Sequence, residues 1–177
     1  MEKSLKSTAV NQGLYLGLIL STLTIIGYVV SLELFTKWWF GIALLLLVII
    51  FGIVSSMKSR SLLGGFISFK QAFTAYFITV LVGILISSVV SIVIFNFVDP
   101  ESAVVLQDMI IQNQMAMMER FGAPQESIDA AVQQMEANGN MYSIGNIFKS
   151  IAYQLVGFSV VGLIVALVVK RKDPDAA

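Results

Sequence analysis

Four long apolar runs without a charged residue divide this chain, and they constrain its fold more than any other feature. A helix crosses the hydrocarbon core of a bilayer with about 20 mainly apolar residues. Each run reaches this length, so we expect membrane-spanning helices over about residues 10–32, 38–57, 71–98 and 150–169. The expected fold is therefore an all-α integral membrane protein that forms a single membrane domain over residues 1–177.

The composition of the chain also requires a lipid environment. Of the 177 residues, 57% are hydrophobic and 12% are charged, whereas a soluble domain carries about 25% charged residues. A chain this small cannot bury so much apolar surface in its own core, because small domains keep a high ratio of surface to volume. We therefore expect the lipid bilayer to be its main partner.

Lysine and arginine lie unevenly along the chain, and this predicts the orientation. Positive residues stay on the cytoplasmic side of a membrane. Eight of the 11 lie before the first run, between the second and third runs, or after the fourth: Lys3, Lys6, Lys58, Arg60, Lys70, Lys170, Arg171 and Lys172. Both termini are thus expected in the cytoplasm. The loop over residues 99–149 lacks an Asn-x-Ser/Thr acceptor, which favours a bacterial inner membrane over a eukaryotic secretory one.

The loop over residues 99–149 is expected outside the cytoplasm, folded as a hairpin of two helices. Asp99 before Pro100 is typical of a helix start. Residues 122–124 break the chain, and the second helix is expected over about residues 124–138, with Gly139 ending it. Apolar residues at helical spacing form a stripe on each helix: Leu106, Ile110, Met117 and Phe121, then Ile128, Val132 and Met135. The stripes can be buried against each other, the membrane surface or a partner, so they form the predicted interaction surface.

Small residues repeat every fourth position in two of the runs. Gly13, Gly17 and Ser21 follow this spacing in the first run, and Gly83, Ser87 and Ser91 follow it in the third. Such spacing lets helices approach closely in a membrane. It fits a homodimer face or internal packing of the first span against the third, and the second is favoured because a four-span protein must first pack its own helices.

The remaining polar residues of the spans are expected to be satisfied locally. Serine and threonine hydroxyls can bond to the carbonyls of their own helix, which we expect for Thr22, Thr24, Ser87, Ser88 and Ser91. The amides of Asn96 and Gln154 lie towards the outer ends of their spans, and we expect them to bond to a neighbouring helix or to interfacial water.

The residue types that carry most catalytic and metal chemistry are missing. The chain has no cysteine and no histidine, which excludes disulfides, the usual zinc sites and cysteine or histidine catalysis. Its net charge of zero gives no indication of a nucleic-acid partner. The methionines of the loop are more typical of packing than of a copper site. We therefore expect no enzyme and no cofactor.

The expected function is that of a structural or accessory membrane component. Its outer hairpin would contact a partner membrane or periplasmic protein, or another copy of the chain. The alternative is a small-solute transporter or channel. The spans carry no ionisable residue and no proline, and transporters commonly place such residues at mid-membrane, which weighs against this alternative.

Several segments of the chain resemble one bacterial family. They are the segment from Gly64 to Phe73 (GGFISFKQAF), the segment from Asn96 to Glu101 (NFVDPE), the Met- and Gln-rich loop, and the final Lys170-Arg171-Lys172. The chain thus resembles "domain of unknown function 4199" over about residues 12–172, and FKQAF and DPE are the most specific elements. The resemblance implies a small inner-membrane protein with four helices, without an established activity or site residues.

Overall fold

The computed structural model describes residues 2–171, so Lys172 of the predicted cytoplasmic cluster lies outside it. Short helices follow two of the long ones: the 3-10 helix η1 spans Leu32–Thr36, and the π-helical turn η2 spans Ile94–Val98 and continues α3. The six α-helices are α1 Glu2–Val30, α2 Trp38–Leu62, α3 Phe69–Val93, α4 Pro100–Arg120, α5 Gln125–Ala137 and α6 Ile144–Val169.

Four of the helices are long and apolar enough to cross a membrane, the number that the sequence predicts. They cover Lys3–Val30, Trp38–Leu62, Phe69–Val98 and Ile144–Val169. The helices extend beyond the uncharged apolar segments of the sequence, because caps and turns, rather than the first charged residue, determine where a helix ends. Ser68 and Gln71 form a capping box at the start of α3, and the Ser143 hydroxyl accepts from the backbone N–H of Asn146 at the start of α6.

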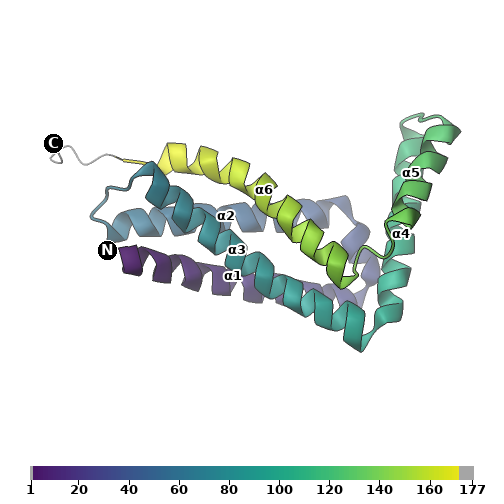
Figure 1. Ribbon diagram of the computed structural model, residues 1–177, viewed down its shortest axis with the longest axis horizontal. Coiled ribbons are helices and arrows are strands. Elements are labelled where there is room, and N and C mark those ends of the chain that lie inside the picture. The colour runs from purple at the N-terminus through teal and green to yellow at the C-terminus, as the bar shows by residue number, and fades with distance from the viewer. Residues whose placement is uncertain (1, 172–177) are drawn as a thin grey trace.

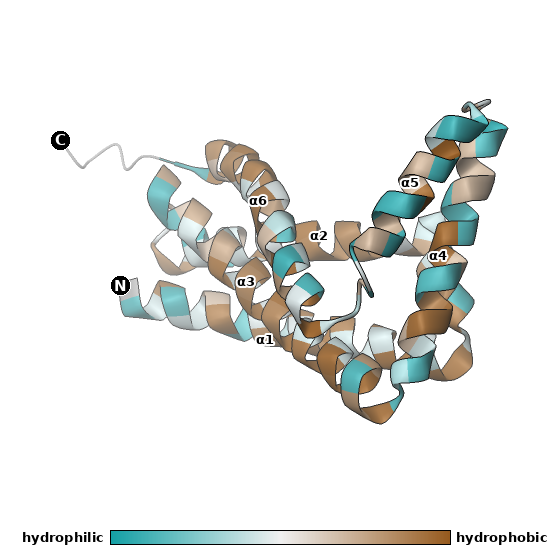
Figure 2. Ribbon diagram, turned by 45° about the vertical axis from the view of Figure 1, so that its right-hand side comes forward, coloured by the Kyte–Doolittle hydropathy of each residue, from teal (hydrophilic) through white to brown (hydrophobic). Residues whose placement is uncertain are grey.

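The four spanning helices lie side by side along the long axis of the molecule (Figure 1). Helix α3 is central and packs against α1, α2 and α6, whereas α2 and α6 touch each other much less. The start of α1 and the end of α6 lie at one end of this bundle, and α4 and α5 project from the other end (Figures 1 and 2). The start of α1 and the end of α6 are therefore at the opposite end of the bundle from the α4–α5 pair.

Helices α1 and α3 approach closely at three glycines. A Cβ atom on Gly13 would lie 2.7 Å from Cβ of Val82, and one on Gly17 would lie 2.7 Å from Cβ of Ile86. A Cβ atom on Gly83 would lie 2.5 Å from Cδ2 of Leu16. The structure thus places these glycines in the α1–α3 contact, where any side chain would push the helices apart. Ser21 is buried, and its hydroxyl has no hydrogen-bond partner within residues 2–171.

A layer of buried hydroxyl groups joins α1, α2 and α3 in the half of the bundle near the termini. Oγ1 of Thr79 lies 2.7 Å from Oγ of Ser55 and 3.0 Å from the carbonyl oxygen of Ala9. Oγ of Ser56 donates to the carbonyl of Ala72 at 3.0 Å. Such bonds hold helices together in lipid, where hydrophobic association is absent. This half of the bundle is consequently closed.

The connection between α2 and α3 is fastened to the end of α6. Ile67 and Arg171 form an antiparallel bridge, with N–H to O=C distances of 3.0 and 2.9 Å. The guanidinium carbon of Arg171 lies 5.9 Å from the ring centroid of Phe66, within cation–π distance. Nη1 of Arg60 donates to the carbonyl of Val169 at 3.5 Å. These contacts close the end of the bundle that carries the chain termini.

Candidate functional site

A cleft of about 740 Å³ lies between α2, α3 and α6, in the half of the bundle nearest to α4. Helix α3 and Leu20 of α1 form its floor, α2 and α6 form its walls, and residues 141–142 border the end nearest to α4. Exposed residues of α2 and α6 form the rim, so the cleft opens to the outside of the bundle between these two helices. Its lining is mostly apolar.

Five polar side chains interrupt the apolar lining of the cleft. They are Ser87, Ser88 and Ser91 on α3, with Ser150 and Gln154 on α6. Ser91 donates to the carbonyl of Ser87 at 3.2 Å. Within residues 2–171, the structure gives no hydrogen bond to the side chain of Ser87, Ser88, Ser150 or Gln154. The cleft therefore presents four polar groups that the protein itself does not satisfy.

These unpaired groups correct one expectation from the sequence. Thr22, Thr24 and Ser91 do bond to the carbonyls of their own helix, at 2.8, 2.9 and 3.2 Å. Ser87 and Ser88 do not. Gln154 makes no bond to a neighbouring helix within residues 2–171, so its expected bond to interfacial water stays a prediction. These side chains border the cleft, whose lining also includes Leu20 of α1. The predicted role of Ser87 and Ser91 in helix packing stays a prediction.

The ring of Tyr76 does not line the cleft, but it fills the space between α2, α3 and α6 in the other half of the bundle. A Cβ atom on Gly52 would lie 2.4 Å from Cε2 of this ring, and one on Gly162 would lie 2.6 Å from Cδ1. The two glycines therefore let α2 and α6 close on opposite sides of the ring. Gly41 and Gly157, further out on α2 and α6, meet no atom within 4 Å and face the open cleft.

Tyr142 borders the outer end of the cleft, and its segment is held from two sides. Its ring lies 4.7 Å from the ring of Phe95 between centroids. Its carbonyl accepts from Nδ2 of Asn96 at 2.9 Å, so Asn96 bonds to a neighbouring segment as expected. Burial raises the pKa of the Tyr142 hydroxyl to about 12. The group is therefore uncharged at neutral pH.

Helix α4 begins at a capped and buried base. The Asp99 carboxylate accepts from the backbone N–H of Ser102 at 3.1 Å and from its hydroxyl at 2.5 Å. The hydroxyl of Tyr28 on α1 donates to the same carboxylate at 3.0 Å. Hydrogen bonds from Ser102 and then from Tyr28 hold the pKa of Asp99 below its ordinary value. The predicted helix start is thus also a link between α1 and α4.

The structure divides the predicted stripe of α4 into two parts. Leu106 is fully buried and Ile110 partly buried in a cluster with Phe95 and Ile94, at the end of the bundle. Met117 and Phe121 lie beyond the bundle, and 52% and 84% of their surfaces are exposed. The division arises because α4 extends past the bundle, so only its first half packs on the bundle helices (Figure 2).

A different face of α4 packs against α5. Ile111, Met115 and Met118 of α4 border a gap of about 40 Å³ with Ala131, Val132 and Met135 of α5. Ile128, also on the predicted α5 stripe, is 1% exposed. The predicted stripe does not include this face, because Ile111, Met115 and Met118 lie on another side of α4 from Met117 and Phe121. Met115, Met118 and Met135 pack in this contact.

Gly122 and Gly139 end the two helices with φ near 72° and 71°, a conformation that favours glycine.

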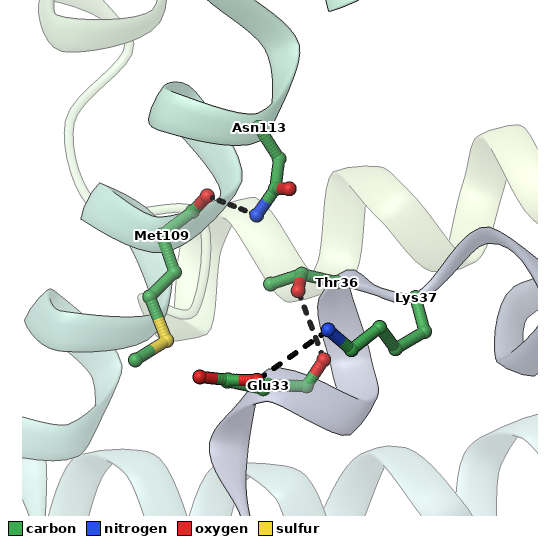
Figure 3. Close-up of polar contacts among 5 residues, drawn as sticks. All are labelled: Glu33, Thr36, Lys37, Met109 and Asn113. Carbon is green, nitrogen blue, oxygen red and sulfur yellow. Dashed lines mark hydrogen bonds and ion pairs between the residues drawn. The ribbon is translucent and has the colours of Figure 1, made fainter. Parts of the chain in front are cut away.

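The junction of η1 with the base of α4 carries polar residues that pair within their own elements (Figure 3). Nζ of Lys37 lies 3.4 Å from Oε2 of Glu33, and the Thr36 hydroxyl donates to the Glu33 carbonyl at 2.9 Å. Nδ2 of Asn113 donates to the carbonyl of Met109 at 2.8 Å. Because each group already has a partner, this junction supports the fold rather than a binding site.

The fold and the cleft define a small helical membrane protein with four candidate spans. Within this class, the chain belongs to the family described as "Protein of unknown function (DUF4199)", whose model matches residues 11–171. This confirms the resemblance seen in the sequence. No curated protein and no solved structure shows significant similarity to the chain.

Sequence reasoning identified no site between the spans. The sequence feature that could have indicated the cleft is the presence of polar and small residues in three spans, in the halves nearest to α4. They are Ser87 and Ser88, Gln154, Gly41 and Gly157. Each is common in membrane helices by itself. Only the tertiary structure shows that they face one space.

Proposed function

We propose that this protein is a non-enzymatic membrane component that binds a partner through the α4–α5 pair. The observation that carries the proposal is the exposed position of Met117 and Phe121. They continue the apolar face that Leu106 and Ile110 bury, but no part of residues 2–171 covers them. Exposed aromatic and methionine side chains on a protruding element are typical of contact surfaces.

The rigid base of α4 supports this proposal. Gln107 of α4 accepts from the N–H of Met141 at 3.2 Å, and its Nε2 donates to the carbonyl of Gly139 at 3.4 Å. These bonds join α4 to the segment that follows α5, and the bonds of Tyr28 to Asp99 and of Asn96 to Tyr142 hold both ends of the pair to the bundle. A surface held in one orientation binds with a smaller loss of conformational freedom.

We further propose that the α4–α5 pair lies outside the cytoplasm of a bacterial cell. Lys58, Arg60, Lys70, Lys170 and Arg171 all belong to the opposite end of the bundle, beside the helix ends that carry the termini. The positive-inside rule places that end in the cytoplasm. A reporter that is active only outside the cytoplasm should then be active when fused after Gly139. A reporter that is active only in the cytoplasm should be active when fused after Arg171. The reverse pattern would refute this orientation.

Site-specific photo-crosslinking tests the proposed contact. A photoreactive amino acid at Met117 or Phe121 should give a crosslinked product in native membranes. The same amino acid at Gln112, an exposed position on another face of α4, is the matched control and should give little. A product of twice the chain mass would identify a second copy, and any other mass a different protein. If Met117 and Phe121 give no more product than Gln112, the α4–α5 pair is not the contact surface.

A small-solute transporter or channel is the second candidate, and the cleft is the observation that favours it. The ring of Tyr76 and the buried Ser55 and Thr79 fill the other half of the bundle. Transport therefore requires this layer to open. Solute flux into proteoliposomes that is lost in a Gly157→Leu variant would support transport, and the absence of flux for ions and small polar solutes would exclude it.

A further inference from the structure

We propose that the cleft between α2, α3 and α6 binds a glycerolipid. One acyl chain would occupy its apolar inner part, and the ester or hydroxyl oxygens would meet the polar groups further out. This site is separate from the α4–α5 surface of the proposed function.

The unpaired polar groups are the first argument. Ser87, Ser88 and Gln154 lie within spanning helices and have no hydrogen-bond partner within residues 2–171. A polar group that faces hydrocarbon without a partner is unfavourable, since lipid chains offer neither donors nor acceptors. The hydroxyls and the amide N–H groups can all donate to ester carbonyl oxygens. A bound glycerolipid thus satisfies groups that the fold leaves open.

The distribution of polarity along the cleft is the second argument. Ser91, Ser150 and Gln154 lie towards the outer end, whereas Ile84, Val161 and other apolar side chains line the inner part. This order matches an amphiphile that enters from the outer leaflet with its chain directed inwards. No Asp, Glu, Lys or Arg lines the cleft, so the part of the ligand held between the helices is uncharged.

The volume of the cleft is the third argument, and it favours a lipid over a helix of another protein. Small-molecule sites have volumes of roughly 300–1,000 Å³, and the cleft has about 740 Å³. A membrane-spanning helix is a cylinder about 10 Å wide and 30 Å long, which corresponds to roughly 2,400 Å³. The Tyr76 ring also fills the space between α2, α3 and α6 in the other half of the bundle, whereas a spanning helix needs a continuous groove.

Photolabelling with a defined lipid tests the proposal. The full-length protein would be reconstituted in phosphatidylcholine vesicles that contain phosphatidylcholine with a diazirine near the end of one acyl chain. Labelled peptides would be mapped by mass spectrometry. We expect preferential labelling of the inner cleft, around Ile84 and Val161, over lipid-facing residues such as Leu163. Equal labelling of both sets would overturn the proposal.

Matched glycine substitutions separate cleft binding from general contact with lipid. Gly157→Leu would fill the cleft, and Gly145→Leu places the same side chain on α6 outside the cleft; neither Cβ atom meets an atom within 4 Å. Gly157→Leu should reduce cleft labelling by about tenfold or more, because it displaces several buried methylene groups of the ligand. Gly145→Leu should leave labelling unchanged. An unchanged signal in Gly157→Leu would refute the site.

A second variant keeps the proposal testable if Gly157→Leu does not fold. Ser87→Ala with Ser88→Ala preserves the shape of the cleft and removes two donors, and it should weaken labelling by about fivefold. Unchanged labelling would count against the proposed polar contacts. Two further results would overturn the glycerolipid: displacement of the probe by a long-chain quinone but not by excess phosphatidylcholine, or crosslinking of cleft residues to another protein in native membranes.

Discussion

Two glycines of α6, Gly157 and Gly162, should respond in opposite ways to the same substitution. Alanine at Gly157 meets no atom within 4 Å, so the variant should gain helix propensity, about 1 kcal/mol relative to glycine. Alanine at Gly162 has the same propensity gain, but its Cβ would lie 2.6 Å from Cδ1 of Tyr76. Carbon atoms pack best at about 3.5–4.0 Å, so this contact is too short by about 1 Å.

The ring of Tyr76 has little room to move away from that contact. Gly52 on α2 approaches its other side so closely that a Cβ atom there would lie 2.4 Å from Cε2. Overpacking of this kind costs about 1–3 kcal/mol. After the propensity gain is included, Gly162→Ala should range from neutral to about 2 kcal/mol less stable than the wild type. It should be about 1–3 kcal/mol less stable than Gly157→Ala.

Unfolding in mixed micelles, followed by tryptophan fluorescence, would measure this difference. A double-mutant cycle identifies its cause, because Tyr76→Leu removes the ring atoms that the new methyl group meets. In the Tyr76→Leu background, the cost of Gly162→Ala should vanish, a coupling of about 1–3 kcal/mol. The reasoning is refuted if Gly162→Ala is as stable as Gly157→Ala, or if its cost persists without the tyrosine ring.

Three further substitutions test individual contacts. The buried hydroxyl of Tyr76 has no partner within residues 2–171, so Tyr76→Phe should stabilise the protein by about 1–3 kcal/mol, measured by the same unfolding assay. Thr79→Val keeps the side-chain shape but removes the hydroxyl at the α1–α2–α3 contact; it should cost about 1 kcal/mol, and a neutral result would show that the buried hydroxyl layer contributes little. Because the pKa of Asp99 is held below 3.8, its charged form stabilises the fold above that pH, and this contribution is lost as the pH falls through the lowered value. The thermal stability of the wild type should therefore approach that of Asp99→Asn in acid, and a constant difference between them would refute the role of the carboxylate.

The α4–α5 pair shows how far sequence patterns reach. The cap at Asp99, the break at residues 122–124 and the stop at Gly139 are local features, and the helix boundaries follow them closely. The partners of each face are not local. Leu106 and Phe121 belong to the same stripe in sequence, yet one is fully buried and the other 84% exposed. They differ because Leu106 lies against the end of the bundle and Phe121 lies beyond it. No residue pattern within α4 shows where the bundle ends.

The sequence by itself determined that this chain has four spanning helices and two amphipathic ones between the third and the fourth. It could do so because the bilayer requires about 20 apolar residues per span and because caps act within one helical turn. Only the tertiary structure decided that α2 and α6 meet at Tyr76 and separate beyond it. That arrangement depends on Gly52 and Gly162 lying on either side of one ring, although they are far apart in the sequence. The cleft lies in the other half of the bundle, where Gly41 and Gly157 meet no atom within 4 Å.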